Sequence, residues 1–206
     1  ASYAEEVCAA IISKTGMLRH QILINSSHTH TGPVIGLEEV KAYGLPDDQA
    51  RATMRYSKWL EKQLVNVAVE AIASRRPAKL SWGSGVVHFP MNRREFTERG
   101  VILGVNARGP ADRSVPVLRI DGADGKLMAA IFGTACHNTT LGPKNMELSG
   151  DFAGYAQRQL EQQHLGAMAM FVQNCGGDAN PYPRGSEEIA SVHGRELAAE
   201  VERVLG

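Results

Sequence analysis

Four stretches of the chain repeat their apolar residues with the spacing of an amphipathic α-helix. The last of them is the clearest, because Ile189, Val192, Leu197 and Val201 fall roughly on one face. The second stops before Pro77, a residue type that disfavours helical backbone at the preceding position. The pattern therefore predicts four helices, at residues 2–14, 48–74, 151–164 and 187–205.

Five further stretches are short and rich in apolar residues, which is typical of β-strands. Two of them flank a Gly/Asp turn in VLRIDGADGKLMAAIF and predict an antiparallel β-hairpin at residues 117–132. Mixed helices and strands favour an α/β fold, a layered sandwich with a mixed β-sheet core and helices outside. The predicted strands are QILIN, AKLSWGSGVVHF, VPVLRID, KLMAAIFGT and AMAMFVQN, and residues 106–114 are predicted to form a loop.

Three of the apolar runs lead directly into a polar loop that contains glycine and ends in proline. The loops are NSSHTHTGP after ILI, GTACHNTTLGP after AAIF, and QNCGGDANP after AMFV. In layered α/β proteins, ligands bind in the crevice beyond the carboxyl ends of the strands. If these strands are parallel neighbours, one crevice collects His28, His30, His137, Asn174 and Asp178.

The first loop carries two histidines separated by a single threonine. In extended backbone, residues i and i+2 point to the same side, so His28 and His30 can present two imidazoles to one point. A catalytic zinc ion takes three protein ligands and a water, and His137 is the candidate third ligand. Asp151 or Asp178 is then a ligand, a partner of a ligand or a general base. Alternatively, Asp151 is only the acidic residue of a helix's first turn.

The other large ring side chains are predicted to be structural. His193 lies inside the last predicted helix and is expected to pack there. Trp59 and Trp82 are expected in the core or at an interface. The candidate chemistry is therefore concentrated in the three loops.

Composition narrows the classes of function. The 206 residues fit one domain. Lys+Arg and Asp+Glu both number 22, so the formal net charge is zero. This balance and the absence of a basic stripe predict no nucleic-acid partner. No apolar run approaches the roughly 20 residues of a transmembrane segment. The 3 cysteines form no paired framework, which favours reduced thiols.

Taken together, the motifs resemble those of the neutral (alkaline, non-lysosomal) ceramidases. NSSHTHTGP is similar to the family signature SSTHTHSGP, and AAIFGTACHNTTL is similar to the strand and loop that carry the family's next zinc histidine. LSGDFAGYAQRQLE, FVQNCGGDANP and MNRRE resemble three further family segments, and all of the matches occur in the family's order along nearly the whole chain.

The resemblance implies a zinc-dependent hydrolase that cleaves the amide bond of an N-acyl lipid such as ceramide, within a layered α/β sandwich. It implies that His28 and His137 are zinc ligands. It places His30 beside them, for proton transfer or for binding the tetrahedral intermediate. Arg93 would line the pocket, and Asp178 lies in the matching GDANP segment.

The chain departs from the family pattern in two ways. Asn180 stands where the family's GDVSP segment has a serine that is proposed to be catalytic. Attack by a metal-activated water needs no serine, so we favour that mechanism. The family's remaining zinc ligands, a glutamate and a tyrosine, come from sequence beyond this chain. We therefore interpret residues 1–206 as a single domain that is a portion of a larger catalytic domain.

Other functions remain open alternatives. One is a catalytically inactive ceramidase-like binding or accessory domain, which Asn180 supports; another is a metal hydrolase that acts on a different small amide or ester. A metallo-β-lactamase pattern would need Asp-His after HxH, whereas Gly32 and Pro33 follow here. A TIM barrel needs about 250 residues of repeating strand–helix units, which the predicted hairpin does not fit. A soluble protein is expected, cytoplasmic or exported, and the oligomeric state is left open.

Overall fold

The structure is a computed structural model that describes residues 2–206. Its backbone divides into two compact units. A helical unit comprises residues 2–24 and Pro33–Arg76, and a sheet unit comprises Asn25–Gly32 and Pro77–Gly206. That residues 1–206 form a single domain within a larger catalytic domain stays a prediction.

The helical unit is built around two of the predicted helices. Val7 and Ile11 of the first pack against Val65 of the second and form a small buried cluster. No helix in the described part of the chain is long and apolar enough to cross a membrane. The elements of this unit are α1 (Tyr3–Thr15), a 3-10 turn (Arg19–Gln21), α2 (Leu37–Tyr43) and α3 (Asp47–Ala73), of which α2 was not predicted.

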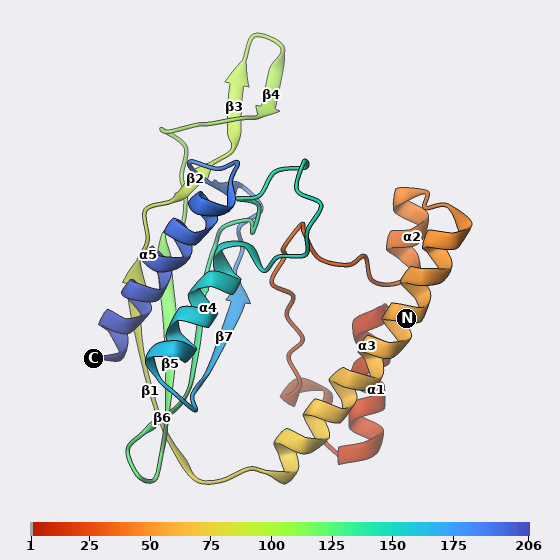
Figure 1. Cartoon of the computed structure of the whole chain (residues 1–206), viewed down its shortest axis with the longest axis vertical. Coiled ribbons are helices and arrows are strands. Elements are labelled where there is room, and N and C mark those ends of the chain that lie inside the picture. The colour runs from red at the N-terminus through yellow and green to blue at the C-terminus, as the bar shows by residue number, and fades with distance from the viewer. Residues whose placement is uncertain (1) are drawn as a thin grey trace. The chain divides into compact units, whose positions relative to one another are not determined.

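A four-stranded sheet forms the centre of the sheet unit, in the order β1-β5-β6-β7 (Figure 1). The pairs β1/β5 and β5/β6 are antiparallel, and β6/β7 is parallel. The predicted hairpin and the mixed α/β sheet are thus confirmed. The strands are β1 (Ala78–Val86), β5 (Ser114–Gly122), β6 (Leu127–Thr134) and β7 (Met168–Gln173).

Two helices, α4 (Asp151–Gln163) and α5 (Glu187–Leu205), lie side by side against one face of this sheet (Figure 1). They approach closely because residue 194 is glycine. A Cβ there would overlap that of Tyr155 and lie 2.8 Å from the Phe152 carbonyl oxygen. The core between helices and sheet is apolar and includes Val115, Phe132, Phe152, Leu197 and Val201.

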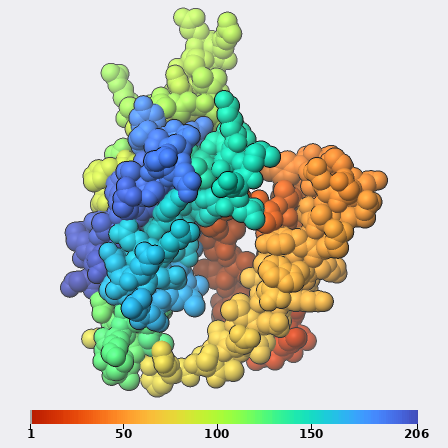
Figure 2. All heavy atoms as spheres, viewed as in Figure 1, coloured from red at the N-terminus to blue at the C-terminus, as the bar shows by residue number. Residues whose placement is uncertain are grey.

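Two short antiparallel pairs extend the sheet unit beyond the main sheet. β2 (Pro90–Asn92) pairs with β8 (Ala179–Pro181), and β3 (Arg94–Thr97) pairs with β4 (Gly100–Leu103). Figure 2 shows the β3–β4 hairpin, in yellow-green, as a projection from this unit. Residues 106–113 form the predicted loop, and residue 114 already begins β5.

The predicted strand QILIN is wrong, because residues 22–25 form no strand. Its apolar side chains gain little burial, with Leu23 82% and Ile24 38% exposed. Asn25 bonds to the edge strand β7 through its side chain alone: its amide accepts from the Gln173 N–H and donates to the Gln173 carbonyl. One such bridge cannot replace the row of backbone bonds that defines a strand.

The structural predictions for the ring side chains are confirmed in part. His193 is buried, its ring stacks on Phe89, and its Nε2 bonds to the Pro183 carbonyl. The tryptophans do not lie in the core, because Trp59 is 53% and Trp82 86% exposed.

All three cysteines have free thiols, as expected.

Candidate metal centre

The centre is built on the carboxyl end of β6, where the chain leaves the sheet beside the end of its parallel neighbour β7. This is the edge of an α/β sheet at which ligands usually bind. His137 follows β6 by three residues and is only 8% exposed. Its backbone N–H donates to the Ala179 carbonyl, at 3.0 Å, which ties the loop after β6 to β8.

The ring of His137 is held in one orientation by the loop after β7. Its Nδ1 lies 2.7 Å from the Gly176 carbonyl oxygen and donates to it. The carbonyl can approach so closely because residue 176 is glycine: a Cβ there would lie 2.5 Å from the Cys136 nitrogen. The bond fixes the tautomer, so the Nε2 of His137 keeps a lone pair free for a cation, as in many metal sites.

The loop of His28 and His30 reaches the same place by a turn rather than by an extended strand. His28 adopts a left-handed backbone conformation with φ of 57°, which is uncommon outside glycine. The two imidazoles therefore do not meet through an extended backbone, and the predicted cause of their alignment is wrong. Thr29 and Thr31 hold the turn in place, since both hydroxyls donate to the Ser149 carbonyl at 2.9 Å.

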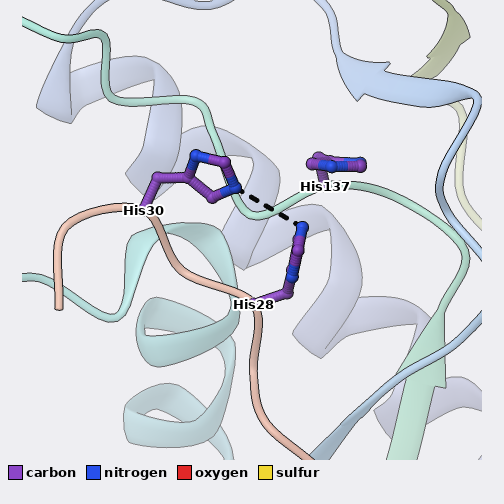
Figure 3. Close-up of side chains that lie close together, drawn as sticks. All are labelled: His28, His30 and His137. Carbon is purple, nitrogen blue, oxygen red and sulfur yellow. Dashed lines mark hydrogen bonds between the residues drawn. The ribbon is translucent and has the colours of Figure 1, made fainter. Parts of the chain in front are cut away.

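All three imidazoles nevertheless gather at one point (Figure 3). The Nε2 atoms of His28 and His30 are 3.4 Å apart, and one nitrogen of each of the three rings lies within 4.8 Å of the others. The His28 ring is central, with its centroid 4.4 Å from that of His137 and 5.0 Å from that of His30. Of the five residues predicted to converge, the three histidines are thus confirmed to lie together.

The electrostatic surroundings of His137 and His30 favour the neutral form of these two imidazoles. Desolvation lowers the pKa of His137, and the hydrogen bond to Gly176 only partly opposes this. Desolvation is also the largest cause of the lowered pKa of His30. His28 and the positive charge of Arg93 lower this pKa further. Neutral imidazole is the form that binds metal ions, so the site is poised for a cation at neutral pH.

The geometry and chemistry of these residues fit a zinc ion. Two nitrogen ligands about 2.1 Å from a tetrahedral zinc are about 3.4 Å apart, which matches the spacing of His28 and His30. Imidazole is also a preferred ligand of zinc and of other transition metals. A ring nitrogen of His137 lies within 4.8 Å of those of the other two histidines, and its bond to Gly176 supplies the outer support typical of such sites.

Arg93 and Asn180 form a polar group next to the histidines. Arg93 donates from Nη1 to Asn180 Oδ1 at 3.2 Å and from Nε to the Gly177 carbonyl at 3.1 Å. The Thr139 hydroxyl donates to the same Asn180 oxygen at 3.3 Å. Desolvation lowers the pKa of Arg93, and its positive charge contributes to the lowered pKa of His30 and His137. The Gly177 carbonyl that Arg93 contacts directly follows Gly176, which holds the His137 ring. The group could bind a carbonyl or an anion.

The acidic and amide candidates occupy different places. Asp151 is 1% exposed, and its carboxylate accepts from the backbone N–H groups of Leu141 and Phe152. These bonds support the interpretation of Asp151 as a first-turn acid. Asp178 is half-buried near Arg93, and its negative charge only partly opposes the lowering of the Arg93 pKa. Asn174 donates from its backbone N–H to the Thr134 carbonyl at the end of β6.

Two residues that support the site were not predicted. Gly176 is the first, although the pair of glycines in QNCGGDANP is a sequence signal of a close backbone approach. Asn138 is fully buried; its side chain donates to the Ser27 carbonyl, accepts from the Ala153 N–H, and so joins the histidine loop to α4. Its only sequence signal is its position next to His137.

Curated relatives of the chain are neutral ceramidases. Neutral ceramidase B of Dictyostelium discoideum is 29% identical over 183 residues, which cover 80% of this chain and 24% of the relative. Neutral ceramidase A of the same organism is 28% identical over 196 residues, covering 85% of this chain and 26% of the relative. The chain thus spans about a quarter of the length of these relatives. No protein-family model matches it.

Solved structures show the same fold. A ceramidase complexed with C2 superposes with a TM-score of 0.76 at 21% identity, covering 99% of this chain and 34% of that structure. The neutral ceramidase from Pseudomonas aeruginosa superposes with a TM-score of 0.70 at 20% identity, covering 97% of this chain and 34% of that structure. The α/β layered fold predicted from the sequence is therefore confirmed.

Proposed function

The chain is a relative of the neutral ceramidases that covers part of their length, and on that premise we propose that it carries part of the catalytic site of a zinc-dependent amide hydrolase. The proposed substrate is an N-acyl lipid of the ceramide type. The observation that supports the proposal best is the gathering of His28, His30 and His137 at the carboxyl ends of β6 and β7.

In this proposal His28 and His137 hold the metal, as the resemblance implies, and His30, whose Nε2 also lies at the spacing of a second ligand from that of His28, is the alternative. The rings of His28 and His137 are the closest pair of the cluster, and the Gly176 carbonyl fixes which nitrogen of His137 is available. When bound, zinc would polarise the substrate carbonyl and lower the pKa of a water from 15.7 to about 7. Ligands from outside residues 1–206 would complete the coordination sphere.

His30 and Arg93 act on the substrate in this scheme. His30 faces His28 and is the more exposed of the flanking rings, so it is placed to move a proton to or from the reacting amide. The Arg93 guanidinium is placed to stabilise negative charge that develops on the carbonyl oxygen. Asn180 keeps Arg93 in position through its side-chain oxygen, and the Asp178 carboxylate adds a negative charge near Arg93.

One observation favours a second function, a binding or accessory domain without catalysis. Asn180 replaces the serine that the resemblance would place there, and its side-chain oxygen is occupied by bonds from Arg93 and Thr139. An amide in this position cannot act as a nucleophile. Catalysis by metal-activated water survives this replacement, whereas catalysis by a serine does not.

Elemental analysis of the full-length gene product, combined with hydrolysis of a panel of N-acyl amides, separates these functions. We expect one zinc ion per molecule and release of fatty acid from long-chain N-acyl amines. Short-chain amides and esters in the panel test the alternative that the substrate is a different small molecule. Zinc without hydrolysis of any member would favour the binding domain, and absence of both would refute the metal site.

A further inference from the structure

A cavity lies entirely within the helical unit, between α2 and α3. Its volume is about 670 Å³, within the range of 300–1,000 Å³ that is typical of small-molecule sites. The apolar part of its wall consists of Leu37, Val40, Ala50, Met54 and Trp59. Leu37 and Trp59 are each about half exposed, so the cavity is an open groove whose apolar wall meets solvent.

Four positively charged side chains of α3 line the same groove: Arg51, Arg55, Lys58 and Lys62. Their spacing of four, three and four residues puts them on one face of the helix, along a strip about 16 Å long. Within residues 2–206 none of them forms an ion pair, and no acidic residue lines the groove. An apolar floor edged by unpaired cations is complementary to a molecule with an apolar chain and a negative charge.

We propose that this groove, defined by α2 and the cationic face of α3, binds a long-chain fatty carboxylate as a single molecule. The identity of the ligand rests on the proposed function. Hydrolysis of an N-acyl amide breaks the C–N bond, adds the hydroxyl of water to the acyl carbon and a proton to the nitrogen, and so releases a carboxylic acid and an amine. At neutral pH the acid is an anion and the amine a cation, so the four cations of α3 select the acid.

Arg51 and Arg55 are the residues suited to hold the carboxylate. They lie one helical turn apart, and the planar guanidinium group donates in the paired geometry that a carboxylate accepts. The aliphatic stems of Lys58 and Lys62 extend the apolar wall next to Trp59, while their charged ends remain in water. The concave form of the groove suits one chain lying between two helices.

Binding of dodecanoate, below its micellar concentration, to the full chain tests this directly. The chain has 2 tryptophans, so in a Trp82→Phe background the fluorescence reports on Trp59 in the groove. We expect a saturable change that the double variant Arg51→Gln/Arg55→Gln weakens by at least about tenfold. The control Arg75→Gln/Arg76→Gln removes the same charge from the helical unit outside the groove and should bind as the parent does.

Further probes separate this ligand from others. Ala50→Phe fills the groove without changing its charge and should abolish dodecanoate binding, with circular dichroism confirming the fold. Equal binding of dodecylamine would show that the cations do not select, and would overturn the proposal. Binding to phosphatidylglycerol vesicles without binding of monomeric dodecanoate would overturn it in favour of a membrane surface. Because binding needs no catalysis, hydrolysis without dodecanoate binding would refute this inference and leave the proposed function standing.

Discussion

At the scale of single residues, the three histidines have different expected roles, although their rings lie together. His28 is central and exposed, so its replacement removes ligand atoms without opening the core. We expect His28→Ala to abolish both zinc binding and hydrolysis. We expect His30→Ala to keep zinc but to lower kcat by about 10²–10⁴-fold, the usual contribution of a proton-transfer group.

Metal content by elemental analysis and kcat of the two variants, with circular dichroism as the test of folding, distinguish these roles. Full zinc content in His28→Ala would refute the ligand assignment. Loss of zinc in His30→Ala would instead mean that all three histidines are ligands, the alternative left open by the sequence.

Gly176 gives a second prediction at this scale, because the chain offers its own control. A Cβ at Gly176 would collide with the Cys136 backbone, whereas a Cβ at the neighbouring Gly177 meets nothing within 4 Å. Gly176→Ala should therefore displace the carbonyl that orients His137 and weaken zinc binding by about 10–100-fold. Gly177→Ala should bind zinc as the parent does. Competition with a fluorescent chelator measures both affinities, and equal affinities would contradict the positioning role of Gly176.

At the scale of elements, the packing of α4 on α5 depends on Gly194. Gly194→Ala should destabilise the fold by about 1–3 kcal/mol, because the added methyl group meets Tyr155 and the Phe152 backbone. Gly154→Ala on α4 is the matched control. Its Cβ meets nothing within 4 Å, so it should be neutral or stabilise the helix by about 0.5–1 kcal/mol. Urea denaturation measures both, and equal midpoints for the two variants would rule out the close contact.

A carboxylate of α5 that contacts β1 should make the stability of the fold depend on pH. Glu200 accepts from the Val86 N–H at 2.7 Å and from Arg203. These bonds lower its pKa from 4.5 to about 2, with Arg203 the largest cause. Because this pKa is lower in the folded state, the ionised Glu200 stabilises the fold above pH 4.5. This stabilisation is lost as the pH falls towards 2. Glu200→Gln should flatten the acid limb of the stability–pH curve, and an unchanged limb would exclude this contribution.

The elements that sequence predicted correctly are those whose signal is local. The periodicity of α1, α3, α4 and α5 and the turn chemistry of the β5–β6 hairpin lie within each segment. QILIN failed because a strand also needs a partner, and its backbone finds none within the described residues. The pairing of β2 with β8 was missed because three-residue strands far apart in the chain carry almost no pattern.

The residues of the candidate site also divide into those with a local sequence signal and those whose role depends on distant contacts. The gathering of His28, His30 and His137 could be predicted because residue type and loop position suffice to name candidate metal ligands. Gly176 and Asn138 were missed because their roles lie in contacts with distant backbone. The left-handed turn at His28 was missed for the same reason, since hydrogen bonds from neighbouring threonines to Ser149 stabilise it.

At the scale of the whole molecule, zinc should act as a stabilising ligand of the sheet unit. The three histidines come from two segments of this unit that are more than 100 residues apart in sequence, so a shared cation would cross-link them in the folded state only. Binding to the folded state alone stabilises it, by about 2.7 kcal/mol when free zinc is a hundredfold above its Kd. A chelator should therefore lower the thermal midpoint of the protein, and added zinc should restore it.

Thermal unfolding followed by circular dichroism, with and without chelator, checks this coupling. The matched variant is His28→Ala, whose midpoint should respond neither to chelator nor to added zinc. Zinc that binds unfolded cysteines or histidines would reduce the shift in both proteins, so the difference between them isolates the histidine cluster. An equal response in the parent and in His28→Ala would mean that the stabilising metal binds elsewhere. A response in the parent alone would show that the metal binds at the two histidine loops and that this binding stabilises the folded sheet unit.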